Sequence, residues 1–402
     1  MSKIEIPSIR FRGFDDAWEQ CKLSEIADKV TEKNAGLQYV ETFTNSAEFG
    51  IISQRDFFDH DIAKLGSLDG YYIVKNEDFV YNPRISTSAP VGPINRNKLG
   101  RTGVMSPLYT VFRPHDIDTT YLEYFFKCGY WHSFMNFNGD SGARSDRFSI
   151  KDNVFFQMPV PIPHIDEQRK IGELLTCLDH LITLHQRKFE KLTNVKKSMF
   201  KKMFPKDGAE VPDVRFREFS GGWEKHKVGD FLTESRIIGN TGLTAKKLTV
   251  KLWGKGVVEK SDAYGGSAHT QYYVRKDGQF MYGKLDFLHA AFGIVPDSLD
   301  GYESTLDSPA FDLSGIDGQF LMNTVIQENF YLRNGMIANG SRKAKRIHVD
   351  TFLEMDILTP SMEEQKKIGA YFVQLDEHIS FAQIEIGKLQ NLKEALLEKM
   401  FV

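Results

Sequence analysis

Three short motifs in the sequence approach patterns that carry chemistry, and each lacks something that the chemistry requires. Residues 278–284 match the GxxxxGK of a phosphate-binding loop, but Leu285 stands where a serine or threonine would hold magnesium. Residues 82–84 (NPR) depart at the third position from the Asn-Pro-Pro-aromatic motif of adenine methyltransferases. Residues 364–366 (EQK) end like a nuclease motif without its Pro-Asp pair, and charges in the first turn of a helix explain them better. The sequence therefore predicts no catalytic residue.

Histidine and cysteine are also spaced unfavourably for metal binding or nucleophilic catalysis. The eleven histidines are scattered and form no HExxH motif. The three cysteines, Cys21, Cys128 and Cys177, lie far apart, so neither a zinc site nor a disulfide framework is expected. We therefore predict that this chain holds no metal, binds no cofactor of its own, and acts by binding rather than by catalysis.

Two loops concentrate positive charge, although the whole chain has a formal net charge of -3. Residues 84–101 contain four Lys/Arg and no acid, and residues 333–346 contain five and no acid. Arginine can contact two acceptors of guanine at once, and asparagine can do the same for adenine. Polar loops on a rigid body therefore suit nucleic-acid recognition. The alternative is a basic surface loop without a partner.

The candidate nucleic-acid contacts are drawn from these loops and from the positions beside them. They combine arginines, lysines, hydroxyl groups and one amide: Asn82, Arg84, Ser86, Thr87, Arg96, Lys98, Arg101, Arg144, Ser145, Arg147, Lys284, Arg333, Arg342, Lys343, Lys345 and Arg346.

The length and composition indicate a globular protein with more than one domain. At roughly 100–200 residues per domain, 402 residues imply two to four domains. A chain with 41% hydrophobic and 26% charged residues has ordinary packed cores. No apolar run approaches the roughly 18 residues of a membrane span, and the first residues lack the apolar segment of a signal peptide. We therefore expect a cytoplasmic chain without a membrane partner.

The sequence repeats itself in two pieces, and this repeat defines its organisation. Residues 6–26 return at 211–231 with a constant offset of 205. Residues 158–204 match residues 355–401 without a gap, and 18 of these 47 positions are identical. The chain is therefore a tandem of two units, each with a repeated frame around a body of its own.

Each long repeated segment is predicted to form one helix with a single apolar seam. Apolar residues alternate at spacings of four and three, as in a coiled coil. The seam positions are Ile171, Leu175, Leu178, Ile182, Phe189 and Leu192 in the first helix and Ile368, Phe372, Leu375, Ile379, Ile386 and Leu389 in the second. Each helix has roughly 39 residues and a length of about 58 Å. We expect the helices to pack antiparallel within the chain; pairing between two chains is the alternative.

Lysines interrupt the two seams at equivalent positions, Lys196 and Lys393. A polar residue at such a position can fix the register of the helices. We expect instead that each lysine lays its aliphatic stem along the seam and extends its ammonium group into water. The first helix also ends in a basic stretch, residues 187–206, with eight Lys/Arg and one acid. This stretch is either a solvated face or a patch for phosphate or another subunit.

The bodies between the repeated segments share only fragments, such as residues 71–81 beside residues 272–282. Both contain strand-like runs broken by Gly, Pro and Asn and one apolar helical stretch, which indicates a mixed α/β body. The predicted fold class is α+β: two mixed α/β domains separated by two long helices that form an intramolecular antiparallel coiled coil, with pseudo-two-fold symmetry. One frame around two different bodies suggests a scaffold that presents two specificities.

The repeated frame resembles the specificity subunit of Type I restriction–modification enzymes. The resemblance is carried by PIPHIDEQRKIGELLTCLDHLI at 161–182, by TPSMEEQKKIGAYFVQLDEHIS at 359–380, and by the openings IRFRGFDDAWE at 9–19 and VRFREFSGGWE at 214–224. It extends over the whole chain and includes the order body, long helix, body, long helix.

The resemblance implies that two target-recognition domains each read one half of a split target in double-stranded DNA. It also implies that the helices act as a spacer and dock two methyltransferase (M) subunits, which restriction (R) subunits then join. These partners use S-adenosylmethionine, ATP and Mg for adenine methylation, translocation and cleavage. The implied division is residues 1–157 for the first recognition domain, 158–206 for the first helix, 207–354 for the second recognition domain and 355–402 for the second helix.

Two other functions stay open from the sequence alone. One is a non-catalytic two-headed scaffold whose bodies bind proteins, and salt-dependent binding of duplex DNA by the assembled complex would separate it from a specificity subunit. The other is a cryptic nuclease, which the missing motifs oppose and which cleavage by the chain alone with magnesium would support.

Overall fold

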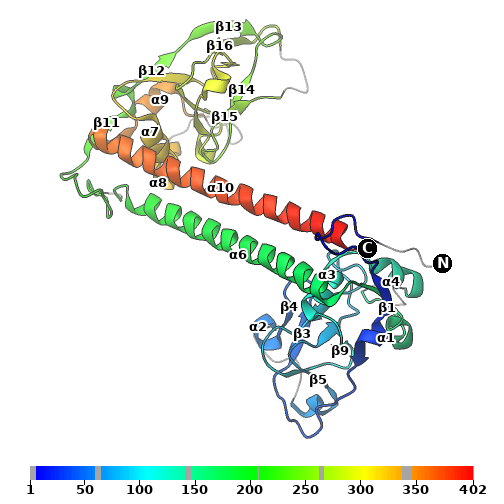
Figure 1. Cartoon of the computed structure of the whole chain (residues 1–402). Coiled ribbons are helices and arrows are strands. Elements are labelled where there is room, and N and C mark those ends of the chain that lie inside the picture. The colour runs from blue at the N-terminus through cyan, green and yellow to red at the C-terminus, as the bar shows by residue number, and fades with distance from the viewer. Residues whose placement is uncertain are drawn as a thin grey trace. The chain divides into compact units, whose positions relative to one another are not determined.

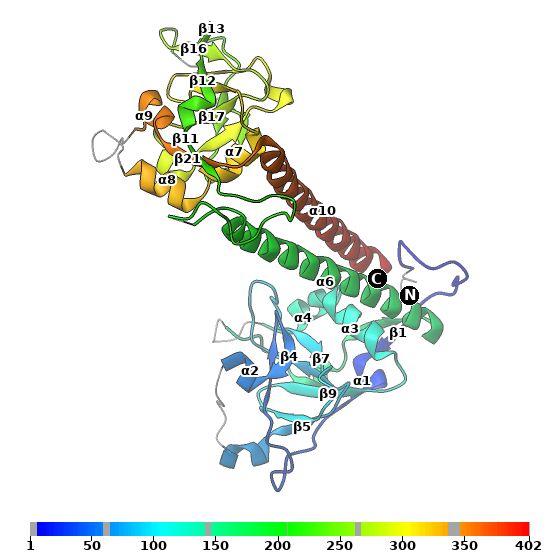
Figure 2. The same cartoon turned by 90° about the vertical axis from the view of Figure 1, so that its left-hand side faces the viewer.

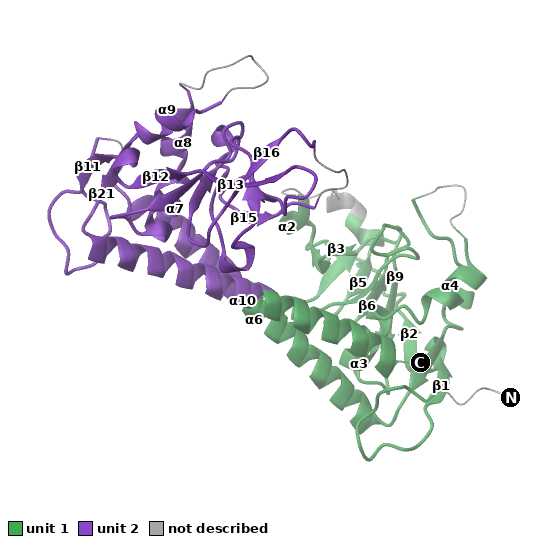
Figure 3. Cartoon of the chain, turned by 90° about the horizontal axis from the view of Figure 1, so that it is seen from above, with its two compact units in different colours: residues 1–186, 384–402 green, residues 187–383 purple. Residues whose placement is uncertain are grey.

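The computed structural model describes residues 6–58, 65–140, 146–206, 208–261, 267–336 and 346–401. It divides into two compact units, which Figure 3 shows in different colours. Unit 1 comprises residues 1–186 and 384–402, and unit 2 comprises residues 187–383. Each unit therefore contains one body, part of the first long helix and part of the second.

Unit 1 is built on a four-stranded antiparallel sheet with the order β2-β9-β6-β7. Its elements can be followed in Figures 1 and 2. They are β1 (Glu19–Lys22), α1 (Leu23–Ile26), β2 (Ala27–Lys29), β3 (Phe43–Ser46), β4 (Gly50–Ser53), α2 (Gln54–Phe58), η1 (Leu65–Gly70), β5 (Tyr72–Val74), β6 (Phe79–Tyr81), β7 (Ile94–Arg96), β8 (Gly103–Met105), β9 (Thr110–Pro114), α3 (Thr119–Lys127), α4 (His132–Asn138), α5 (Asp152–Phe155), β10 (Pro159–Ile162) and parts of α6 (Ile165–Lys202) and α10 (Met362–Met400).

Unit 2 is built on a four-stranded antiparallel sheet with the order β12-β20-β17-β18. Its elements are β11 (Glu224–Lys227), η2 (Val228–Asp230), β12 (Leu232–Ser235), β13 (Ile237–Thr241), β14 (Leu248–Val250), β15 (Val257–Glu259), β16 (Gln271–Val274), β17 (Phe280–Tyr282), η3 (Phe287–His289), β18 (Phe292–Ile294), η4 (Asp297–Leu299), β19 (Glu303–Ser304), β20 (Ala310–Leu313), α7 (Gly318–Val325), α8 (Glu328–Gly335), α9 (Val349–Leu353), β21 (Asp356–Thr359) and the remaining parts of α6 and α10.

The two sheets have the same register although the bodies share little sequence. Phe79 of β6 lies opposite Phe112 of β9 in unit 1, and Phe280 of β17 lies opposite Phe311 of β20 in unit 2. Successive side chains of a strand point to opposite faces. Val80, the neighbour of Phe79, accordingly belongs to a second core on the other side of the sheet. Both bodies therefore share one fold with two apolar layers.

The long helices pack against each other inside each unit and run antiparallel. In unit 1, Leu175 near the start of α6 shares a core with Leu396 near the end of α10. In unit 2, Met199 near the end of α6 shares a core with Phe372 near the start of α10. Figure 1 shows the two helices side by side. The α+β fold with two β-rich domains and a helix pair within one chain is thereby confirmed, whereas the pseudo-two-fold relation stays a prediction.

The predicted seam falls into two groups by burial. Seven of its positions are buried: Ile171, Leu175, Leu178, Ile182, Ile368, Phe372 and Leu375. The other five are half-buried: Phe189, Leu192, Ile379, Ile386 and Leu389. The buried seven lie toward the N-terminal part of each helix, where the helix also meets its own body.

The two seam lysines form ion pairs, so the prediction that their ammonium groups extend into water was wrong. Lys393 of α10 lies 2.5 Å from a carboxylate oxygen of Asp179 of α6 in unit 1. Lys196 of α6 pairs with Asp376 of α10 in unit 2. Both pairs join equivalent positions of the repeat, at the offset of 197. Because opposite charges facing each other favour one alignment, these pairs help to fix the register of the helices.

The repeated Glu-Gln run fastens the start of each long helix to the rest of its unit. Glu167, 1% exposed, accepts two hydrogen bonds of 2.7 and 2.8 Å from Arg10. Gln168 accepts a bond of 2.9 Å from the backbone NH of Asp118 and donates one of 2.9 Å to the carbonyl of Pro163.

Unit 2 repeats these contacts with Glu364 bonded to Arg215 at 2.7 Å and Gln365 bonded to Asp317 and Pro360. These bonds account for the glutamate and the glutamine of the Glu-Gln-Lys run. Its glutamate and glutamine have structural roles through these bonds, which the interpretation as charges in the first turn of a helix did not predict.

Each body core includes the end of a long helix. Phe401, just after α10, stacks on Tyr121 of unit 1 with ring centroids 5.4 Å apart. Phe204, just after α6, stacks on Phe320 of unit 2 with centroids 5.8 Å apart. The backbone NH of Ile9 also donates a 3.0 Å bond to the carbonyl of Lys399. The start of the chain therefore lies beside the end of α10.

Among the residues that the structure describes, no helix combines enough length with enough apolar character to cross a bilayer.

Candidate nucleic-acid interface

Two predicted contacts of the first body, Arg84 and Arg147, are brought together by the fold. Ile85 donates a backbone hydrogen bond of 3.0 Å to Asp146, and Phe148 donates one of 2.7 Å to Pro83. This pairing makes Arg84 and Arg147 direct neighbours in an antiparallel bridge. Arg84 is exposed and Arg147 is half-buried. Neither guanidinium group has an ion-pair partner among the described residues, so both are available to a ligand.

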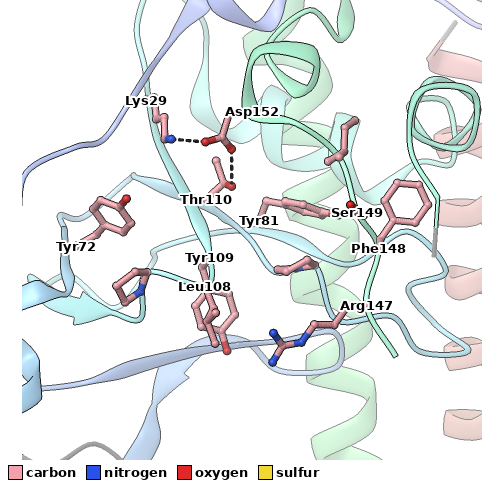
Figure 4. A pocket seen from close by; sticks show the side chains of 13 residues that line it. Lys29, Tyr72, Tyr81, Leu108, Tyr109, Thr110, Arg147, Phe148, Ser149 and Asp152 are labelled. Carbon is pink, nitrogen blue, oxygen red and sulfur yellow. Dashed lines mark hydrogen bonds and ion pairs between the residues drawn. The ribbon is translucent and has the colours of Figure 1, made fainter. Parts of the chain in front are cut away.

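A pocket of about 480 Å³ lies beside this bridge and is lined by Arg147. Figure 4 shows the aromatic rings of Tyr72 and Tyr109 among its lining side chains. Lys29 pairs with Asp152, which also accepts a hydrogen bond of 3.4 Å from Thr110. An open hollow with aromatic rings, a guanidinium group and hydroxyl groups can take a planar, polar ligand such as a nucleobase.

The second body has a positively charged cluster at the equivalent place. Ile347 donates a 3.1 Å backbone bond to Lys284, just as Phe148 does to Pro83, so Lys284 and Arg346 take the places of Pro83 and Arg147. Burial lowers the pKa of the Lys284 ammonium group. The carboxylates of Glu234 and Asp307 counteract this shift, whereas the guanidinium groups of Arg236 and Arg346 add to it.

Arg96 and Lys98 have other roles in the first body. Arg96 is only 10% exposed in its side chain and pairs with Glu123 at 2.6 Å and with Glu77 at 3.0 Å. Lys98 pairs with Glu123 at 2.7 Å. Burial raises the pKa of Glu123, but the ion pairs with Lys127 and Lys98 outweigh it and lower this pKa to about 2. The guanidinium of Arg96 is therefore committed to the interior of the unit, and we leave Arg96 out of the proposed interface.

Arg101 and Asn82 are also engaged within unit 1. Arg101 makes a two-pronged ion pair with Glu41, with bonds of 2.7 and 2.8 Å. Asn82 donates a 2.8 Å bond to the carbonyl of Asn45 and accepts a 3.0 Å bond from the backbone NH of Arg84. Asn82 thus anchors the β3–β4 hairpin to the loop that carries Arg84, which makes it a positioning residue rather than a free contact.

The remaining predicted contacts fall into three groups. Ser86 and Thr87 are exposed in the loop after Arg84, where Ser86 also lies 3.3 Å from the hydroxyl of Ser88. Arg333 is exposed near the end of α8, on a separate hollow of unit 2. Arg144, Ser145, Arg342, Lys343 and Lys345 lie outside the described residues.

Sequence reasoning missed two groups that the structure makes prominent. The first is the tyrosines of the pocket, Tyr72 and Tyr109, whose approach to Arg147 depends on tertiary pairing. The second is Trp253, which is 58% exposed in the β14–β15 hairpin. The signal for Trp253 was present in the run KLWGKG at 251–256, because a tryptophan between lysines and glycines is rarely part of a core.

Comparisons with known proteins agree with this architecture. A family described as Type I restriction modification DNA specificity domain matches residues 15–194. The Type I restriction enzyme MjaVIII specificity subunit of Methanocaldococcus jannaschii is 24% identical over 271 residues, a match that spans 62% of this chain and 62% of that relative. The crystal structure of the S subunit of a Type I restriction-modification system from M. genitalium shares the fold, with a TM-score of 0.57, 11% identity and 99% coverage of both chains.

The family match covers the first body and most of the first long helix, and the repeat carries the same frame into the second half of the chain. The shared fold extends over both bodies and both helices. The first body and most of the first long helix are therefore similar in sequence to the DNA specificity domain of Type I restriction–modification systems, and the whole chain shares the fold of such an S subunit.

Proposed function

We propose that this protein is the sequence-specific DNA-binding subunit of a Type I restriction–modification complex. One observation carries the proposal. Two bodies whose four-stranded sheets correspond strand for strand present a positively charged site at the same place, yet with different side chains, Arg147 beside Pro83 in one and Arg346 beside Lys284 in the other. Equivalent frames with different contact residues suit the reading of two different half-sites by direct contacts to bases.

The proposal assigns a task to each segment. Residues 1–157 and 207–354 are the two target-recognition domains, and residues 158–206 and 355–402 are the helices that space them and dock two methyltransferase (M) subunits. Restriction (R) subunits join this assembly in the cytoplasm, where its DNA lies. The partners, not this chain, use S-adenosylmethionine, ATP and Mg.

The proposed DNA contacts are seven members of the predicted set, of which Arg346 also pairs with Asp307 at 3.6 Å. They are Arg84, Ser86, Thr87 and Arg147 in the first body and Lys284, Arg333 and Arg346 in the second. Lys98 and Arg101 are half-exposed but paired with carboxylates. Each would contact a DNA phosphate by exchanging its carboxylate partner for that phosphate. Arg144, Ser145, Arg342, Lys343 and Lys345 remain candidates from the sequence alone.

The decisive experiment is to reconstitute the chain with its cognate methyltransferase subunits and to map N6-methyladenine in modified DNA. We expect methylation at a bipartite sequence, duplex binding that weakens steeply with salt, and no methyl transfer or cleavage by the chain alone. If the chain were instead a two-headed protein scaffold, the complex would bind DNA without sequence preference. Robust turnover by the chain after repeated purification would contradict a non-catalytic role.

The contact residues and the buried arginine should respond differently to substitution. Arg84→Ala combined with Arg147→Ala is expected to weaken specific DNA binding by about 10–100-fold at unchanged stability, because each contact to a base edge is worth about 1–3 kcal/mol. Arg96→Ala is expected to destabilise the chain by about 1–3 kcal/mol, because the buried carboxylate of Glu123 loses one of its ion-pair partners. Fluorescence anisotropy and thermal unfolding measure the two effects. Unchanged DNA binding together with a loss of stability in the double variant would show that Arg84 and Arg147 do not contact DNA.

A further inference from the structure

The β14–β15 hairpin of unit 2 exposes a large aromatic side chain at its turn. The strands pair from Leu248 to Glu259, and residues 251–256 (KLWGKG) connect them. Trp253 is 58% exposed and Leu252 is 38% exposed. Tryptophan is one of the side chains that gain most from burial, so an exposed tryptophan in a folded turn calls for a binding partner.

The backbone of this turn is strained and firmly held. Trp253 has a φ of 62°, in the left-handed region that bulky residues rarely adopt. Its NH donates a 2.8 Å bond to His289, and the NH of Gly254 donates a 2.8 Å bond to Ala290. The indole also meets the His289 ring edge to face, with centroids 5.6 Å apart. The fold therefore holds Trp253 outward in a conformation that a glycine would adopt more easily, as is common at functional sites.

The charges around Trp253 fit a polyanion. Lys251 and Lys255 flank it, and both are exposed. Within the described part of the chain, neither lysine has an ion-pair partner. The residues from 251 to 256 contain no acid. Lysines beside an exposed aromatic ring are the combination by which proteins hold nucleic-acid backbones and contact bases.

Unit 1 has an exposed aromatic residue at the equivalent turn. Its β3–β4 hairpin occupies the same place in the sheet, because the parallel bridge between Thr42 and Val104 corresponds to that between Lys247 and Glu303. Phe49, at the tip of β3–β4, is 59% exposed. The two turns differ in length and sequence, yet both end in an exposed ring.

We infer that the β14–β15 turn, residues 251–256, is a DNA-contacting element of the second recognition domain. Trp253 packs its indole against bases of the half-site, and Lys251 and Lys255 bind the phosphates beside it. The inference rests on the proposed function and adds to it a contact that lies outside both basic loops. Docking of a methyltransferase subunit on the same turn is the competing outcome that the experiment must separate.

The test uses the chain reconstituted with its methyltransferase subunits and duplexes that carry 2-aminopurine in the half-site read by the second domain. Trp253→Gly removes the ring and relieves the left-handed backbone, so this variant should be no less stable than the wild type. It should bind the specific duplex roughly tenfold more weakly, because one base loses its stacking partner. The quenching of 2-aminopurine fluorescence on binding should also be lost. Trp253→Phe should retain most of both signals. Leu243→Ala, at a residue that is 64% exposed in the same unit, is the matched control and should change neither.

The lysines give a second, independent readout. Lys251→Ala with Lys255→Ala should lower the slope of log binding constant against log salt by roughly two, at unchanged half-site sequence. Wild-type affinity and quenching in Trp253→Gly would overturn the inference. So would loss of methyltransferase subunits on size exclusion while the remaining complex binds DNA normally. A wild-type complex without any sequence preference would overturn the proposed function itself, whatever the variants do.

Discussion

Replacing Phe401 with alanine is expected to destabilise unit 1 by about 3–5 kcal/mol, the usual cost of truncating a buried phenylalanine. Phe401 is only 5% exposed and stacks on Tyr121, and its ring also lies 6.5 Å from that of Phe125. The neighbouring Met400 belongs to the same core. The end of α10 is therefore part of the interior of the first body, and loss of the Phe401 ring should destabilise the packing of α3.

Hydrogen exchange resolved by peptide can assign this loss to one unit. Phe401→Ala should accelerate exchange in α3 and β6 and leave β17 and α7 unchanged. Phe204→Ala is the matched variant and should do the opposite, because Phe204 packs on Phe320 and Trp223 of unit 2. Phe381→Ala, at a residue that is 55% exposed on α10, should stay within about 0.5 kcal/mol of the wild type. Equal effects on both units would show that the two cores do not depend separately on the two helix ends.

Exchanging residues 27–157 for the body of another specificity subunit should replace one half of the DNA target and leave the other half unchanged. The frame favours such an exchange, because the body lies between strands β1 and β10, which pair with each other from Glu19–Ile162 to Lys22–Pro159. A specific site is commonly preferred over other DNA by about 10³-fold or more, so the switch of half-site should be close to complete. Methylation mapping of genomic DNA measures it.

The reciprocal exchange of residues 232–354 supplies the control. Strands β11 and β21 pair around the second body in the same way, so this variant should change the other half-site only. Unfolding curves that match the wild type would show that each hybrid has kept its cores. A change in both half-sites after a single exchange would contradict the reading of the target by separate domains.

The parts of this architecture that were predictable from sequence are those set by periodicity and repetition. The apolar seam of α6 and α10 follows from spacings of four and three, and the shared frame follows from identical residues at a fixed offset. The pairing of Lys196 and Lys393 with aspartates was missed, because each partner lies on the other helix, some 180–215 residues away. Only the antiparallel register brings these charges together.

The candidate site was harder to predict, because charge alone does not reveal how a cation is used. Arg96 was assigned to a basic loop without acids, yet the structure places it at the end of β7 and buries it against Glu77 and Glu123, which come from other segments. Arg84 and Arg147 were both named from the sequence, but only the backbone bridge shows that they are neighbours. The run KLWGKG indicated an exposed Trp253, but the hydrogen bonds that hold its turn to His289 and Ala290 follow only from the structure.

The discontinuous composition of unit 1 has a consequence for biosynthesis. Its core requires Met400 and Phe401, which the ribosome adds only after all of unit 2, whereas unit 2 is one continuous stretch of chain. At about 5–20 residues per second, the ribosome adds Met400 and Phe401 roughly 10–40 s after the rest of the unit 1 core. Domains usually mature in the order in which they are translated, but here the second should be finished before the first. A chain that stops before Met400 should accordingly have one mature unit and one open core, which limited proteolysis would detect as preferential cleavage in unit 1.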